Sequence, residues 1–369
     1  MRVRTPKLVR LAAVGLAGAT TLGAVALPAS ASTQATIVNV VGYSVAGPAY
    51  KALETAFQAT SAGSGVTFTN TFGASGTEAT NVANGLPADV VNLSYYSDEE
   101  ADATAGAIPS NWQDQENTVG GVNPASATVY TTPGIVTDST VVFIVRKGNP
   151  LGIKQWSDLT RKGVRLVTPN PETSGSAKWN LLAAYAAWKA LGHTPDQDQN
   201  FVKSILEHAV AEPPSGSTAL STFLAGTGDV LLDYEDDALA AVAAGDAITV
   251  IVPPQTLLIE NPVALTNTGL KKPAAVAFYQ YLFSSAGQTI LANLGYRSVL
   301  KSVWAATKSS FAAFKKPTDL QTVTDINSGG WPVLDKEFFG ASVTFPSNDP
   351  THPNEGIVTY LEEFAGRAN

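Results

Sequence analysis

From residue 35 onward, short runs rich in β-branched residues alternate with longer Ala-rich stretches of helical periodicity. This alternation predicts βα units arranged around a largely parallel sheet. We expect strands at Thr36–Val41, Val66–Thr71, Asp89–Leu93, Thr140–Arg146, Val164–Thr168, Asp229–Asp233, Ile248–Val252 and Leu257–Leu265. We expect helices near Pro48–Thr60, Thr77–Asn84, Trp156–Lys162, Ala177–Leu191, Asp198–His208, Ser217–Leu224, Glu235–Ala244, Lys272–Phe283 and Ala286–Asn293.

Glycines mark where several of these helices should stop. A left-handed residue after the last helical turn is most often glycine, because glycine has no side chain to clash in that conformation. Such glycines follow five of the expected helices, at Gly85, Gly163, Gly192, Gly226 and Gly295.

The first 31 residues are typical of a signal peptide. Four basic residues precede the apolar run 11–27, and Ala29-Ser30-Ala31 supplies the small residues of a cleavage site. The apolar run contains Gly and Thr and ends in Pro28, which disfavours a transmembrane helix. We therefore expect an exported protein, periplasmic or extracellular, whose mature chain begins near Ser32.

Composition narrows the classes of partner. The chain has no cysteine, so it has neither disulfides nor a thiol for a lipid anchor, and we expect it to be soluble after cleavage. Its 23 basic and 31 acidic residues argue against nucleic acid as a partner. An anionic ligand would have to be held by local dipoles and directed donors rather than by net charge. The length allows two lobes, each with its own core.

Three segments share one layout, a strand that ends in a small-residue turn and runs into a helix. They are Phe72–Glu78, Thr168–Ala177 and Pro213–Thr218. In each, free backbone N–H groups and the positive end of the helix dipole point to one place, as in anion sites. Any one of them is explained by an ordinary helix cap. Three in one chain predict a cleft that holds a dianion without a counter-charge.

Several longer runs resemble those of the sulfate-binding proteins of ABC importers. The resemblance extends from about Val38 to Phe339 and is carried by Gly73–Gly76, Gly85–Val91, Phe143–Pro150, Thr168–Pro171, Ser174-Gly175, Trp179-Asn180, Gly228–Leu231, Tyr296-Arg297 and Gly329–Trp331.

This resemblance implies an α/β type II periplasmic-binding-protein fold, in which two lobes with central mixed, mostly parallel sheets are joined by two crossing strands. We expect lobe one at 35–138 plus 258–340, lobe two at 139–257, and a C-terminal loop and short helix at 341–369. The protein would be a monomer that binds sulfate, or a related oxyanion such as thiosulfate, and delivers it to the membrane permease of an ABC importer. No cofactor is implied.

Carried over position by position, the resemblance implies backbone N–H donors at Ser44, Ser75, Gly175, Ser176 and Gly216. It places a serine hydroxyl donor at Ser174. The family's remaining donor is a tryptophan indole, and its position here is Tyr234. Other departures are Ser176 for a glycine, Ser44 for an aspartate and Ser217 for an arginine.

The change to tyrosine bears on selectivity. An indole N–H only donates, whereas a hydroxyl both donates and accepts. Sulfate needs donors alone, but hydrogen phosphate carries a proton that needs an acceptor, and Tyr234, Ser174 or Asp233 would supply one. Sulfate is our first expectation, and phosphate, molybdate or tungstate on the same fold is the alternative.

Other functions have less support in the sequence. The three histidines are far apart, and the acids Asp233, Glu235, Asp236 and Asp237 suit a helix start better than a cation site. No nucleophile motif or P-loop lysine accompanies the glycine turns, so we expect no catalytic and no metal residues. An exported ester hydrolase using the same anion cradle is the rival class, and an adhesion or signalling module without a ligand is a third.

Overall fold

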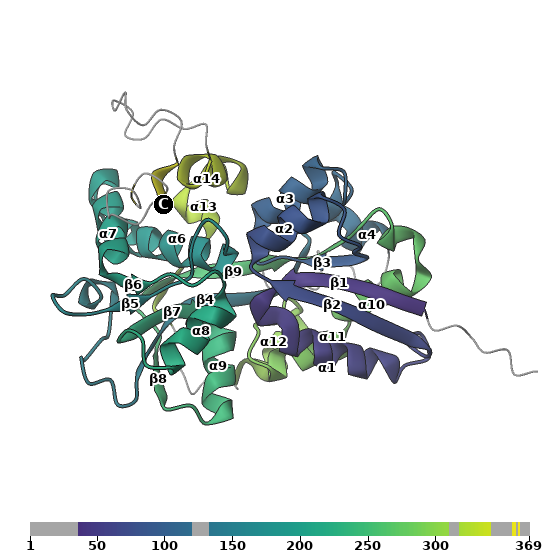
Figure 1. Cartoon of the computed structure of the whole chain (residues 1–369), viewed down its shortest axis with the longest axis horizontal. Helices are drawn as coiled ribbons and strands as arrows, with labels where there is room; N and C mark the ends of the chain where they lie inside the picture. The colour runs from purple at the N-terminus through teal and green to yellow at the C-terminus, as the bar shows by residue number, and fades with distance from the viewer. Residues whose placement is uncertain (1–35, 120–132, 310–316, 341–355, 359–360, 362–369) are drawn as a thin grey trace, which may run out of the picture. The chain divides into compact units, whose positions relative to one another are not determined.

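Within the described residues, the first sheet has four strands in the order β10-β3-β1-β2. Figure 1 shows β3, β1 and β2 of this sheet side by side. Strands β1, β2 and β3 are mutually parallel, and β10 is antiparallel to β3. Alternate residues of β1 face opposite sides, so that Val38 and Val40 pack with the core on the α1 side and Val41 packs with α2. The strands are Thr36–Tyr43, Val66–Gly73, Val90–Asn92 and Ala264–Leu265, and the main helices on them are α1 (Gly47–Gln58), α2 (Ser75–Ala83), α3 (Tyr96–Thr104), α10 (Pro273–Leu282) and α11 (Ser285–Asn293).

The structure is a computed structural model that describes residues 36–119, 133–309, 317–340, 356–358 and 361. The expected signal peptide at 1–31 and the expected loop at 341–355 lie outside these ranges. Among the described residues, no helix combines the length and apolar character that crossing a lipid bilayer requires.

In the described part of the chain, the second sheet has seven strands in the order β11-β9-β4-β7-β5-β6, with β8 paired to β4. Parallel and antiparallel pairs are mixed in it. Its faces alternate as in the first sheet: Phe143 packs on the α6 side, whereas Ile144 packs with Phe223 of α8. Its elements are β4 (Ile135–Arg146), β5 (Leu166–Val167), α6 (Gly175–Ala190), α7 (Pro195–His208), β6 (Ala209–Ala211), α8 (Gly216–Leu224), β7 (Val230–Tyr234), α9 (Glu235–Ala244), β8 (Ile248–Ile251), β9 (Gln255–Pro262) and β11 (Asp319–Gln321).

Two strands link the sheets. The first half of β4 pairs with β9, and its second half pairs with β7 and β8. Beyond Pro262 the chain continues directly into β10 of the four-stranded sheet. The sequence then returns to the seven-stranded sheet at β11, which pairs with β9. The residue bounds of the two expected lobes stay a prediction.

The C-terminal part of the described chain adds short helices around these sheets. The most important for the site is α14, Trp331–Phe338. The others in this part are α12 (Lys301–Thr307) and α13 (Val323–Ile326), and the shorter helices before them are η1 (Ser44–Ala46), η2 (Trp112–Asp114), α4 (Gln115–Thr118), η3 (Trp156–Asp158) and η4 (Gly269–Lys271).

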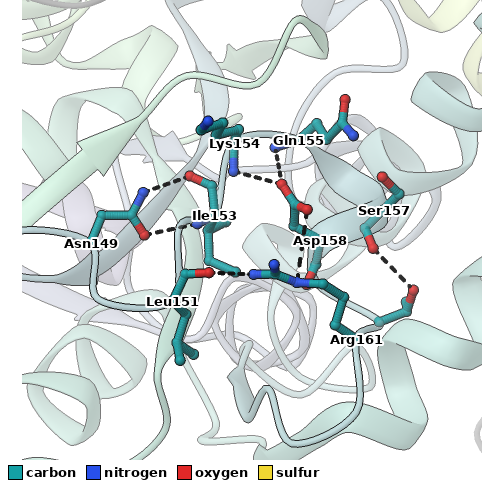
Figure 2. Close-up of polar contacts among 9 residues, drawn as sticks. Asn149, Leu151, Ile153, Lys154, Gln155, Ser157, Asp158 and Arg161 are labelled. Carbon is teal, nitrogen blue, oxygen red and sulfur yellow. Dashed lines mark hydrogen bonds and ion pairs between the residues drawn. The ribbon is translucent and has the colours of Figure 1, made fainter.

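Most expected elements are confirmed within a few residues, and four of the expected stop glycines follow helices with positive φ, between 85° and 110°. Gly163 also has a positive φ, of 89°, but the helix expected before it does not form. The strand expected at Leu257–Leu265 is two strands, β9 and β10. The helix expected at Trp156–Lys162 is wrong, because only the single turn η3 forms there. Side chains take up the backbone groups of this segment: Asp158 accepts from the N–H groups of Lys154 and Gln155, and Asn149 bonds both backbone groups of Ile153 (Figure 2).

Candidate functional site

The three small-residue turns meet in the structure. The N–H of Gly76 at the start of α2 donates to the carbonyl oxygen of Thr173, 3.0 Å away, just before α6. A Cβ atom on Gly175 would lie 3.3 Å from Cβ of Ser75, and one on Gly216 would lie 2.9 Å from Oγ of Ser176. The starts of α2, α6 and α8 therefore converge on one place.

Glycine is required at the start of α6 by this close approach. A Cβ on Gly175 would be only 2.1 Å from Oγ of Ser94 and 2.9 Å from Cβ of Tyr95, separations that real Cβ atoms do not show. With glycine there, the N–H groups of Gly175 and Ser176 begin α6 beside the start of α2. The first N–H groups of a helix have no carbonyl of their own helix within reach, so they remain available to an anion.

Ser44 joins this group from the end of β1. It begins the single turn η1, and its Oγ accepts a hydrogen bond from the N–H of Ser217 in α8, at 3.3 Å. The neighbouring Val45 approaches α8 as well, since its Cγ2 would lie 3.1 Å from a Cβ on Gly216. The start of η1, with Ser44, therefore contacts the start of α8, with Gly216.

The hydroxyl of Ser174 does not cap its helix. Ser174 is the N-cap residue of α6 with extended backbone, but its side chain accepts no capping hydrogen bond, and its Oγ lies 3.1 Å from Oγ of Ser176. By contrast, Ser215 before α8 accepts from the N–H of Thr218 at 3.3 Å and is an ordinary cap. The buried hydroxyls of Ser174 and Ser176 are therefore placed with the free N–H groups of α6.

Ser75 uses its side chain within the protein. Its Oγ donates to Asp98 at 2.6 Å and accepts from the N–H of Ser94 at 2.9 Å. Burial raises the pKa of Asp98, and the charge of Lys178 acts in the opposite direction. Lys178 itself lies over the ring of Tyr95, 4.4 Å from its centroid. Only the backbone N–H of Ser75 is left for a ligand.

Tyr234 ends β7 and begins α9 as its N-cap residue, with none of its surface exposed. Its ring centroid is 6.4 Å from that of Tyr43. Burial raises the pKa of Tyr234 well above the ordinary value for tyrosine, so the phenol stays protonated. Its hydroxyl forms no hydrogen bond of good geometry among the described residues, but the side chains of Ser94 and Asn261 lie close enough to lower its pKa through hydrogen bonding.

Ser94 lies at the same place, although the sequence patterns described above do not identify it. It follows β3, its N–H donates to Ser75, and its carbonyl oxygen accepts from the indole of Trp179 and from the amide of Asn261. It is fully buried, and its Oγ has no partner within the described chain. The available signal was its position in a fourth strand-to-helix turn, which contains no glycine.

The acids at the start of α9 are held by structural partners. Glu235 pairs with Arg297 at 2.7 Å, Asp236 accepts from Ser139 at 2.5 Å, and Asp233 accepts from the N–H of Tyr234 at 2.8 Å. Within the part of the chain that the structure describes, no group of three or more His, Cys, Asp or Glu side chains is placed to hold a metal ion. These contacts favour the helix-start interpretation over a cation site.

Helix α14 contacts residues on both sides of the convergence. The ring of Trp331 lies 4.8 Å from that of Tyr95, which follows β3, and 4.8 Å from that of Trp179 in α6. Asp335 accepts from the hydroxyl of Tyr95 at 2.6 Å, and Phe338 packs against Tyr185 of α6 with ring centroids 4.8 Å apart. The helix therefore ties the β3–α3 turn to α6.

Comparison with known proteins gives consistent matches. A family model described as bacterial extracellular solute-binding protein matches residues 38–297. The sulfate-binding protein of Synechococcus elongatus is 34% identical over 317 residues, which are 84% of this chain and 85% of the relative. The thiosulfate-binding protein of Escherichia coli is 32% identical over 286 residues, 75% of this chain and 79% of the relative.

Among solved structures, the sulfate-binding protein SubI from Mycobacterium tuberculosis is similar over 82% of this chain and 99% of its own. Its sequence identity to this chain is 37%, and the TM-score is 0.74.

Proposed function

This chain belongs to the family of bacterial extracellular solute-binding proteins, and we propose that it captures sulfate, or the related oxyanion thiosulfate, and delivers it to an ABC importer. The observation that carries this proposal is the convergence of the starts of α2, α6 and α8. Each helix start contributes roughly half a positive charge, so that together they favour a dianion in a protein of net negative charge.

The contacts we propose are those implied by the family resemblance. Backbone N–H groups of Ser44, Ser75, Gly175, Ser176 and Gly216 donate to the anion, together with the hydroxyls of Ser174 and Tyr234. All of these residues except the half-buried Ser44 are buried, which removes competing water and strengthens each hydrogen bond. The convergence of the starts of α2, α6 and α8, with η1 beside α8, supports the assignment of the serine and glycine donors.

In this proposal the protein is a binding protein and not an enzyme. Two lobes, 35–138 with 258–340 and 139–257, close over the anion, and the closed form is favoured by the ligand it encloses. The protein works outside the cytoplasm as a monomer after signal cleavage, and the closed form is recognised by the membrane permease. The family membership and the close likeness to SubI support this scheme.

Calorimetric titration of the dialysed protein tests the proposal. Sulfate or thiosulfate should release or absorb heat with one site per chain and should raise the melting temperature, since a ligand at a hundred times its Kd stabilises the folded state by about 2.7 kcal/mol. Absence of heat and of thermal stabilisation with sulfate, thiosulfate, phosphate, molybdate and tungstate would refute it. Turnover of a sulfate or phosphate ester would instead favour the hydrolase.

A further inference from the structure

Two hydroxyls at the site are buried and form no hydrogen bond of good geometry within the described chain. They are Oγ of Ser94 and the phenol of Tyr234, and neither residue has any exposed surface. Leaving a buried hydroxyl without a hydrogen bond is unfavourable, and such groups are rare unless a ligand or water completes them. Ser94 lies against the start of α6, and Tyr234 lies beside Ser94, so both border the place where we propose that the anion binds.

The backbone N–H and carbonyl oxygen of Ser94 both form hydrogen bonds that hold the residue in place. Its N–H donates to Ser75, and its carbonyl oxygen accepts from Trp179 and Asn261. Its Oγ lies against the first residue of α6, only 2.1 Å from the position that a Cβ on Gly175 would occupy. The backbone is thus fixed from three elements, and only the hydroxyl is left to turn.

The Tyr234 phenol lies beside the same hydroxyl. Burial raises the pKa of this phenol, and hydrogen bonding from the side chains of Ser94 and Asn261 lowers it, so both side chains lie close to the phenol oxygen. The oxygen of Asn261 already accepts from Tyr43 and from Thr137, each at 3.2 Å. The hydroxyls of Ser94 and Tyr234 therefore form a neighbouring pair at one end of the site.

The N–H groups and the other serine hydroxyls where the helix starts converge are poorer acceptors. Backbone N–H groups only donate. The hydroxyl of Ser75 already donates to Asp98 and accepts from Ser94, and the hydroxyls of Ser174 and Ser176 lie within hydrogen-bond distance of each other. The hydroxyls of Ser94 and Tyr234 lie beside each other and form no hydrogen bond of good geometry with any described group, so both can turn: each donates to an unprotonated oxygen when its proton points toward the ligand, and each accepts when it points away.

We propose that Ser94 and Tyr234 are specificity-determining residues, which let this site accept a singly protonated tetrahedral oxyanion, hydrogen phosphate, as well as fully ionised sulfate. The inference rests on the proposed anion-binding function and extends its ligand class. A site made of donors alone rejects a protonated ligand because the ligand's proton then faces another N–H. Here a hydroxyl of the pair accepts that proton.

The test is calorimetric titration with sodium sulfate, selenate and phosphate at neutral pH, on the natural protein and on Ser94→Ala, Tyr234→Phe and the double variant. Each substitution removes one hydroxyl and little else. Ser221→Ala is the matched control, since that hydroxyl is exposed on α8 and donates only to the carbonyl of Ser217. Thermal denaturation checks that each variant is folded. If one of the two single variants does not fold, the other still tests the inference.

A site that leaves a buried polar group unmatched discriminates between two ligands by about ten-thousand-fold or more. In the natural protein the ratio of sulfate affinity to phosphate affinity should be smaller than this. The double variant should lose about tenfold or more in phosphate affinity beyond its loss for sulfate, with selenate following sulfate. A general structural weakening would reduce all three affinities by one factor and would overturn the inference.

Sulfate binding without measurable phosphate binding in the natural protein would overturn it as well, while leaving the proposed function intact. Failure of the natural protein to bind any of the three anions or thiosulfate would count against the proposed function itself.

Discussion

The backbone N–H of Gly76 and the carbonyl oxygen of Thr173 form a hydrogen bond of 3.0 Å between the β2–α2 turn and the loop that leads into α6. Between these two turns the contact is backbone to backbone, so it depends on the path of the chain more than on side-chain identity. A methyl group on Gly76 would lie 3.2 Å from the same carbonyl oxygen. Substitutions around this contact should change ligand binding more than folding.

Gly175→Ala should weaken sulfate binding by about tenfold or more, equivalent to about 1.4 kcal/mol. The added methyl would overlap Oγ of Ser94 and Cβ of Tyr95, and the start of α6 would have to move away from the β3–α3 turn. Its φ is not positive, so alanine causes no backbone strain there. Calorimetry with sulfate measures the loss.

Gly47→Ala is the matched control for that variant. Gly47 also begins a helix, α1, but the nearest atoms to a Cβ there belong to the side chain of Phe72, at 3.5 Å or more, which is ordinary contact. Its sulfate affinity should equal that of the natural protein. Equal affinities for all three proteins would show that the approach of Gly175 to Ser94 has no part in binding.

Two serines that precede helices should respond in opposite ways. Ser174→Ala should weaken sulfate binding by ~1–2 kcal/mol with little loss of stability, because its hydroxyl makes no cap. Ser215→Ala should instead lower the free energy of unfolding by ~1 kcal/mol and leave affinity unchanged, because Ser215 caps α8. Calorimetry and chemical denaturation of both variants separate the effects. An unchanged affinity in Ser174→Ala would mean that the site is misassigned.

A helix or strand can be predicted from the sequence when its pattern is local, that is, when it lies within the element itself. β-branched strands and Ala-rich helices ending in glycine have local signals, so β1, β2, α1 and α6 were found. Strand β6, of three residues, is too short for a periodic pattern and depends on its pairing with β5. Helix α3 lacks the apolar periodicity that predicts a helix, because its buried residues are Asp98, Glu99 and Asp102.

The residues of the site also differ in whether their signal in the sequence is local or depends on long-range contacts. The small-residue turns at Ser75, Gly175 and Gly216 were recognisable because each follows a strand and opens a helix. Ser94 was not, since its importance arises from contacts with Trp179 and Asn261, 85 and 167 residues away along the chain. No local pattern encodes contacts at that range.

Stability should decrease from mildly acidic to mildly alkaline pH. Burial raises the pKa of Asp102 and of Asp236 to about 7, from 3.8 for an ordinary aspartate. Between these values the folded protein binds more protons than the unfolded chain, so the free energy of unfolding falls as pH rises and levels off above the folded-state pKa. The melting temperature should therefore be higher near pH 5 than near pH 8, as measured by circular dichroism.

Asp236→Asn should reduce this pH dependence, because the amide oxygen still accepts from Ser139 but no longer titrates. Asp229→Asn is the control. The pKa of Asp229 is lowered by its hydrogen bond to Arg165, so this carboxyl is ionised throughout the range and its removal should leave the slope unchanged. A slope for Asp236→Asn identical to that of the natural protein would contradict the assignment.

Trp331 should report ligand binding through its fluorescence. Its indole lies between Tyr95, which follows β3, and Trp179 of α6, so any relative movement of the β3–α3 turn and α6 changes its surroundings. Sulfate should shift or quench the emission of the natural protein, and Trp331→Phe should lose most of that change while it still binds sulfate in calorimetry. Trp188→Phe is the matched control, because Trp188 stacks on Phe201 and His193 within the α6–α7 segment. If Trp331→Phe kept the full emission change and Trp188→Phe lost it, sulfate would act within that segment and not between α6 and the β3–α3 turn.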